Sequence, residues 1–152
     1  MYTASHIAEC ILNECGSLST MKLQKLVYYS QAAHLVYEGD QLFDEDIQAW
    51  ANGPVIPDLF KRHRRKFVVT SGFLGNSTID ELDRSAARSV KRVLAALGDK
   101  TGAELSDLTH SEKPWIDARK GYTPAERCEV VIAPESIRSY YSASDCANPV
   151  FA

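Results

Sequence analysis

Long apolar runs are missing from this chain of 152 residues. Its longest uninterrupted apolar stretch is Val93–Leu97, whereas a helix that crosses a bilayer needs roughly 20 apolar residues. The sequence therefore excludes a transmembrane helix, and no membrane partner is expected. The segment 1–14 lacks a basic start and carries Glu9 among its apolar residues, so it does not predict a signal peptide.

Cysteine is also scarce, with four residues: Cys10, Cys15, Cys128 and Cys146. Their spacing matches no C-x-x-C metal or redox motif. Because no secretion signal is predicted, reduced cysteines and a cytoplasmic location are expected. A chain of this length with 45% apolar and 24% charged residues buries enough surface to fold as one domain without disulfides or a metal.

Apolar residues recur at intervals of three and four along most of the chain, which predicts helices. The predicted helices span about 4–15, 20–38, 57–66, 79–97 and 102–109, followed by two short ones that begin at Pro114 and Pro134. The helix at 20–38 is apolar over more than one face, which is typical of a helix at the centre of a core. Alternating apolar residues at 47, 49 and 51 predict a short strand over 46–51.

These elements predict a mainly α fold. We expect a single compact domain of about six or seven helices around the central helix at 20–38, with at most a short two-stranded sheet that pairs 46–51 with 129–132. The domain is expected to span 1–141. The remaining residues, 142–152, are small and polar without periodicity, which predicts a mobile C-terminal tail. In a further hypothesis, the apolar end of this tail, Val150–Ala152, is a degradation signal.

No local motif for catalysis is present. The sequence lacks both G-x-S-x-G and a phosphate-binding loop, and none of its four histidines has a second histidine four positions away. We therefore predict no catalytic residue, no metal site and no cofactor. A Cys–His hydrolase stays as a third alternative, because His34 or His110 could meet Cys10 or Cys128 only in the folded chain. The more direct expectation for His34 is a hydrogen bond at the edge of the core.

Positive charge is concentrated in one segment. The net charge is −3, yet Lys61, Arg62, Arg64, Arg65 and Lys66 put five positive charges into six positions. Of the 17 basic residues, 12 therefore lie elsewhere, against 20 acidic ones. The patch 61–66 keeps a nucleic-acid-binding regulator open as an alternative function. The lack of interleaved aromatic residues disfavours nucleic acid. The most direct interpretation of the patch is a solvated, charged helix end, and a contact with an acidic protein partner is the next.

Three short blocks follow one another in the chain. They are Leu-Gln-Lys-Leu-Val-Tyr-Tyr with a further glutamine at 23–31, Ala-Trp with Gly-Pro-Val and a proline at 49–57, and Leu-Thr-His with Pro-Trp and an arginine at 108–119. Together they resemble the Panacea-domain family, the SocA-like and GepA-like antitoxins of bacterial toxin–antitoxin systems. The similarity covers about 20–141. Two departures are slight: Val27 replaces a leucine, and Phe60 stands where tyrosine is common.

The resemblance implies a function without catalysis. Members of this family are antitoxins, often encoded in two-gene operons and prophage regions, that bind a toxin protein encoded nearby. Some are similar to proteolytic adaptors that deliver the toxin to a Clp-type protease. For this chain the resemblance implies an antitoxin that neutralises its toxin by direct stoichiometric binding, with such a protease as a further partner if it acts as an adaptor.

Three segments hold polar and aromatic residues beyond what a core requires: Trp50–Pro57, the basic helix and Thr109–Arg119. We expect them to form the partner surface, since tryptophan and arginine are enriched among the residues that dominate protein interfaces. The candidate partner-binding residues are Trp50, Gly53, Pro54, Arg62, Arg64, Arg65, His110, Trp115 and Arg119.

Overall fold

The centre of the fold is one long helix, α2 (Thr20–Tyr37). The computed structural model describes residues 1–152, and every residue of α2 from Leu23 to Leu35 is buried in it. Ser19 begins the helix, because its side chain accepts a hydrogen bond from the Lys22 N–H. A helix buried on all sides needs neighbours in every direction, and this need sets the architecture.

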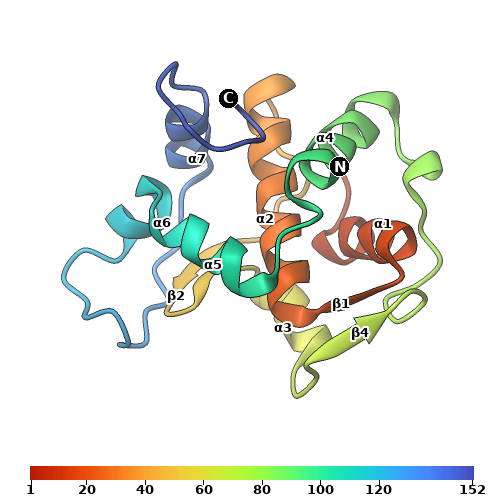
Figure 1. The fold of residues 1–152 in the computed structure, drawn as a ribbon, viewed down its shortest axis with the longest axis horizontal. Coiled ribbons are helices and arrows are strands. Elements are labelled where there is room, and N and C mark those ends of the chain that lie inside the picture. The colour runs from red at the N-terminus through yellow and green to blue at the C-terminus, as the bar shows by residue number, and fades with distance from the viewer.

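Helices surround α2, which runs through the middle of the molecule (Figure 1). On one side lie α1 (Ala4–Cys15) and α4 (Arg84–Leu97), on the other α5 (Gly102–His110) and α7 (Pro134–Tyr141), and all four contact α2. Two shorter helices, α3 (Pro57–His63) and α6 (Lys113–Ala118), complete the set of seven. One cluster of 35 buried residues forms the core. The predicted mainly α, single-domain fold is confirmed.

Strands form two small antiparallel sheets, one more than predicted. β2 (Gln48–Trp50) pairs with β3 (Gly53–Val55) in a hairpin, and β1 (Ser17–Ser19) pairs with β4 (Val68–Thr70). The segment 129–132 is predicted to pair with the strand over 46–51, which is observed as β2. It meets β2 through a single bridge between Gln48 and Val131. The hairpin is the main pairing because a two-residue turn costs far less chain entropy than joining distant segments.

Two helix boundaries also differ from the prediction. α3 ends at His63 instead of 66, because the next residues form a turn. The predicted helix 79–97 begins as a separate 3-10 turn, η1 (Ile79–Glu81), and α4 itself starts at Arg84. Asp83 caps α4 by accepting a hydrogen bond from the Ala86 N–H, so the cap lies after η1.

Polar side chains of α2 fasten neighbouring segments to the helix. Gln24 accepts from the Ile56 N–H at 2.9 Å and donates to the Ile56 carbonyl at 3.3 Å. Gln31 accepts from the Leu42 N–H at 2.7 Å and donates to the Phe43 carbonyl at 2.7 Å. The side-chain amides of Gln24 and Gln31 therefore supply the hydrogen bonds that a neighbouring strand would otherwise give to these buried backbone groups.

His34 makes the hydrogen bond expected of it. Its Nδ1 lies 2.9 Å from Ser89 Oγ of α4. Burial lowers the pKa of His34, so the ring is neutral at pH 7 and joins two core helices without introducing a charge.

A buried carboxylate joins four parts of the chain. Glu112 Oε1 accepts from the Tyr29 hydroxyl at 2.7 Å and from the Tyr141 hydroxyl at 2.6 Å, and its Oε2 accepts from the Asn148 amide at 2.8 Å. Burial raises the pKa of Glu112, while the three donors lower it. The group stays satisfied inside the protein and ties α2, α7 and the C-terminal residues to the start of α6.

Part of the C-terminal segment 142–152, for which the composition predicts a mobile tail, packs against the core. Asn148 and Val150 are buried, and the Phe151 ring stacks on Tyr141 with centroids 4.9 Å apart. The packing depends on Glu112, the buried carboxylate that accepts the hydrogen bond from Asn148. The composition of the tail does not reveal this distant partner. Val150 and Phe151, proposed as part of a degradation signal, are thus engaged in the fold.

Replacing Asn148 by alanine tests this anchoring. The change removes the donor to Glu112 Oε2 and leaves a buried carboxylate oxygen without a partner, which costs about 1–3 kcal/mol. We expect Asn148→Ala to lower the free energy of unfolding in urea by that amount, and Ser144→Ala at an exposed position to leave it unchanged. Equal stability of the two variants would contradict the anchoring.

Candidate functional site

The predicted partner-binding residues separate into a buried and an exposed group. The buried group consists of Gly53, Pro54, Trp115 and Arg119, with His110 partly buried. The exposed group consists of Arg62, Arg64 and Arg65, with Trp50 partly buried beside it. The first group shapes the β2–β3 hairpin from within, and the second forms surface next to the hairpin.

Arg119, expected to contact a partner, is instead the internal support of the hairpin. Its guanidinium donates to the carbonyls of Ala49, Thr123 and Glu126 at 2.9, 2.8 and 2.7 Å. It also lies 5.2 Å from the centroid of the Trp115 ring, within the range of a cation–π contact. Arg119 therefore holds β2 and the loop after α6 in place and is not free to meet another protein.

Trp115, His110 and Gly53 complete this support. Trp115 Nε1 donates to the Trp50 carbonyl at 2.7 Å, and the His110 ring stacks on Trp115 with centroids 4.0 Å apart. Gly53 has a φ of 120°, and a Cβ at this position would lie 2.5 Å from Cε of Lys25. Only glycine allows the hairpin to approach α2 so closely.

Arg64 and Arg65 belong to a strained turn that follows α3, whereas Arg62 lies in the last turn of α3 itself. Arg64 has φ −50° and ψ 136°, Arg65 has φ 73°, and the Lys66 N–H donates to the His63 carbonyl at 3.0 Å. This is a type II turn, whose third residue is normally glycine. Arg65 is the one non-glycine residue of the chain with positive φ. Neither Arg64 nor Arg65 forms an ion pair within the chain that would offset the strain. Backbone strain without such compensation is typical of a functional position.

Apolar side chains extend this turn, and we call residues 62–68 the basic turn. Phe67 is 89% exposed and Val68 is 58% exposed. A strongly exposed aromatic side chain directly after a run of positive charges, with a second exposed apolar residue beside it, is unusual on a surface that only needs solubility. It is the composition expected of a protein contact.

A groove of about 970 Å³ lies beside the basic turn, and we call it the hairpin groove. Its lining comes from the start of α2, the β2–β3 hairpin, α3 with the basic turn, the start of α5 and the segment 125–129. Its apolar lining consists of Met21, Trp50, Ala51, Val55, Phe60, Phe67, Val68, Ala103, Ala125 and Cys128. Lys25, Arg65, Lys66 and Arg127 add positive charge, while the single acidic residue, Glu129, pairs with Arg127 at 2.9 Å.

Lys25 is the unusual member of this lining. It is 1% exposed, and its ammonium makes no hydrogen bond or ion pair, unlike that of Lys22 one turn earlier, which donates to the Gly98 carbonyl at 2.6 Å. Burial lowers the pKa of Lys25 to about 8. Burial also lowers the pKa values of His63 and His110, with a further contribution from Lys25. At pH 7 both rings are neutral, and Lys25 carries an isolated positive charge.

The sequence contains a signal for Lys25 that the motif-based candidates do not use. Lys25 lies between Leu23 and Leu26, next to Gln24, in a helix predicted to be apolar over more than one face. A charged residue in such a helix has no solvent-facing side to occupy. The position therefore predicts either a paired or a functional charge, and the structure shows no pair.

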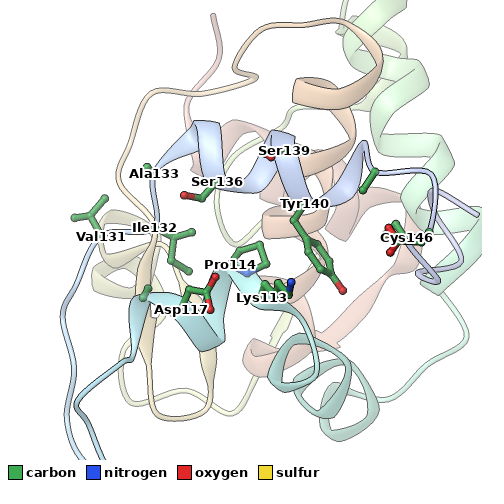
Figure 2. A pocket seen from close by; sticks show the side chains of 13 residues that line it. Lys113, Pro114, Asp117, Val131, Ile132, Ala133, Ser136, Ser139, Tyr140 and Cys146 are labelled. Atoms are coloured by element: carbon green, nitrogen blue, oxygen red, sulfur yellow. The ribbon is translucent and has the colours of Figure 1, made fainter.

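A second hollow, of about 750 Å³, lies between α6 and α7. Figure 2 shows its lining: Lys113, Pro114 and Asp117 from α6, the segment 131–133, Ser136, Ser139 and Tyr140 from α7, and Cys146. None of the predicted partner-binding residues lines it, whereas Trp50 and Arg65 line the hairpin groove. The hairpin groove is therefore the stronger candidate.

Cys10, one of the two cysteines considered for a Cys–His hydrolase, is buried. Burial raises the pKa of Cys10 to about 11, so its thiol is protonated at pH 7 and is a poor nucleophile. No group of three His, Cys, Asp or Glu residues is placed to hold a metal ion. None of the helices combines the length and the hydropathy that a membrane span requires.

Comparison with known proteins identifies the class of this fold and site. Residues 23–116 match the family described as Antitoxin SocA-like, Panacea domain. This is more than half of the chain, which therefore belongs to the SocA-like Panacea-domain antitoxin family, as the three blocks predict. Antitoxin SocA of Caulobacter vibrioides (strain NA1000 / CB15N) is 26% identical over 127 residues, covering 74% of this chain and 68% of that relative. No solved structure matches the chain.

Substitution of Arg119 tests its internal role. Arg119→Ala leaves the buried Ala49 carbonyl without this donor and removes the bonds to the part-buried carbonyls of Thr123 and Glu126, so we expect the free energy of unfolding in urea to fall by about 1–3 kcal/mol. The matched control is Arg62→Ala at an exposed position, which should change stability by less than about 0.5 kcal/mol. Equal unfolding curves for the two variants would return Arg119 to the list of surface candidates.

Substitution of Lys25 tests its isolated charge. The unfolded chain keeps this lysine protonated up to about pH 10.5, whereas the folded protein releases the proton near pH 8, so stability rises with pH across this window. Lys25→Met removes the buried charge, and we expect it to raise stability at pH 7 by up to about 3 kcal/mol and to abolish the rise between pH 8 and 10.5. Lys61→Met, at an exposed lysine, should keep the rise; a Lys25→Met protein that also keeps it would contradict the assignment.

Proposed function

We propose that this protein is a cytoplasmic antitoxin that neutralises a protein toxin, encoded by a neighbouring gene, through direct stoichiometric binding. The observation that carries the proposal is the basic turn: an arginine in a glycine position beside a strongly exposed phenylalanine, at the edge of an apolar groove. Membership of the SocA-like family supports the same function. No step of the proposed activity makes or breaks a covalent bond.

The arrangement of charges favours a protein over nucleic acid as the partner. His63 is buried, and Lys61 lies 3.8 Å from Asp58 in an exposed ion pair. The six-residue patch therefore does not present a continuous row of cations, which phosphate binding along a backbone would favour. An apolar groove with a short basic rim fits a folded or extended polypeptide with acidic side chains.

Delivery of the bound toxin to a Clp-type protease is the narrower form of this proposal. Binding is common to both modes, so the basic turn and the hairpin groove serve either one. The half-life of the toxin in cells with and without this protein separates them: a half-life shortened only when the protease is present supports delivery, and an unchanged half-life supports direct inhibition.

Co-expression with the product of the adjacent gene tests the function. The wild-type chain should restore growth of cells that express the adjacent gene, and the two purified proteins should form a complex of fixed stoichiometry. Arg65→Gly and Phe67→Ala should each weaken the complex at least tenfold, because exposed aromatic and arginine side chains dominate interface energies. Arg65→Gly relieves the strained turn and should raise stability by roughly 0.5–1 kcal/mol, so lost rescue cannot be ascribed to misfolding.

The matched control is Lys91→Ala on the exposed side of α4, which should rescue growth fully. Failure of the wild-type chain to rescue growth or to bind the adjacent gene product would contradict the proposed function. Full rescue by both basic-turn variants would leave the function standing and move the contact surface elsewhere.

A further inference from the structure

The structure does not use the charge of Lys25 for its own stability. A buried cation without a partner is costly, because it loses its hydration and gains no hydrogen bond in return. A side chain of similar volume without charge, such as methionine, would fill the same space between α2 and Gly53. The fold alone therefore does not explain why this position carries an ammonium group.

The place of Lys25 supplies a use for the charge. Its side chain lines the hairpin groove, together with Trp50, Phe60 and Phe67. The Trp50 and Phe60 rings meet edge to face, with centroids 4.9 Å apart. An ammonium among aromatic rings in a groove can bind an anionic group that enters from outside, because the surrounding low dielectric strengthens the attraction.

Charge complementarity indicates the chemistry of the occupant. Arg65 and Lys66 line the same groove, and its one carboxylate, on Glu129, is paired with Arg127. The apolar lining excludes an occupant that is anionic along its whole length, because each phosphate of a nucleic acid backbone would need a cation or water of its own. A polypeptide that alternates apolar and acidic side chains matches both features.

We infer that the hairpin groove binds an extended segment of the toxin that inserts the carboxylate of an aspartate or glutamate side chain against the Lys25 ammonium, with an apolar neighbour packed on Trp50 and Phe60. This inference rests on the proposed function, and it names the partner's chemistry at the same site. The basic turn then binds the same segment at the edge of the groove, where Phe67 covers it.

Proton linkage gives the inference a signature of its own. A carboxylate beside Lys25 favours the charged lysine and raises its pKa above the value of about 8 in the free protein. The facing titratable groups, His63 and His110, are neutral above pH 7 and add no change there. Affinity for an acidic segment should therefore be constant between pH 7 and 7.5 and fall as the pH rises above 8.

Short peptides test the inference without the toxin. The probes are acetyl-Leu-Phe-Glu-Leu-amide and its glutamine counterpart, with affinities for the full-length protein measured by calorimetry at pH 7 and pH 9. We expect the glutamate peptide to bind the wild-type protein at least tenfold more tightly at pH 7, since a hydrogen bond between charged groups contributes about that factor or more. The preference should vanish in Lys25→Met, persist in Lys61→Met and shrink at pH 9.

Each other outcome overturns the inference. Equal affinity for the two peptides, no binding of either, or an undiminished preference in Lys25→Met removes the carboxylate site. Tighter binding of acetyl-Leu-Phe-Gln-Leu with a free C-terminal carboxylate would show that the groove binds a chain terminus and not an acidic side chain. Tighter binding of a ten-nucleotide oligothymidylate that depends on Lys25 would show that the occupant of the groove is nucleic acid and not a polypeptide. Growth rescue by the wild-type chain, scored separately, shows whether the proposed function survives such a result.

Discussion

The burial of α2 on all sides is the constraint on which the rest of the structure depends. A helix without a solvent-facing side must satisfy its polar side chains inside the protein. Gln24 and Gln31 do so by bonding to backbone that lies outside the sheets, and Tyr29 does so by donating to Glu112. Each bond positions a segment that has little regular structure of its own. The same helix therefore forms the core and places the loops around it.

Lys25 is the exception on that helix, because its buried ammonium has no partner within the chain, and the proposed site lies over it. Arg119 and Trp115 hold the β2–β3 hairpin from behind, and Gly53 lets the hairpin approach the lysine closely. These contacts leave a groove over a charge that the fold does not neutralise. A buried charge without a partner, on a helix whose other buried polar side chains are bonded within the chain, is a sign of function.

The residues that support the fold and the residues proposed to contact a partner are not the ones that the three family blocks suggest. Most residues that carry the resemblance, such as Gln24, Pro54 and Arg119, are buried and support the fold. The exposed residues beside the groove, Arg65 and Phe67, lie between the blocks. The same scaffold can therefore carry different side chains at this surface without a change of fold.

The local sequence was enough to predict α1, α2 and α5 to within a residue or two, because apolar spacing and end-capping residues act over a few positions. It also indicated that α2 is central. Only the tertiary structure decided which strand pairs with β2, that Asn148 anchors the C-terminal residues, and that Trp115 and Arg119 face inward. Those outcomes depend on partners far away in the chain, such as Ala49, which lies 70 positions before Arg119. A side chain's type does not reveal whether its partner lies inside the chain or in another protein.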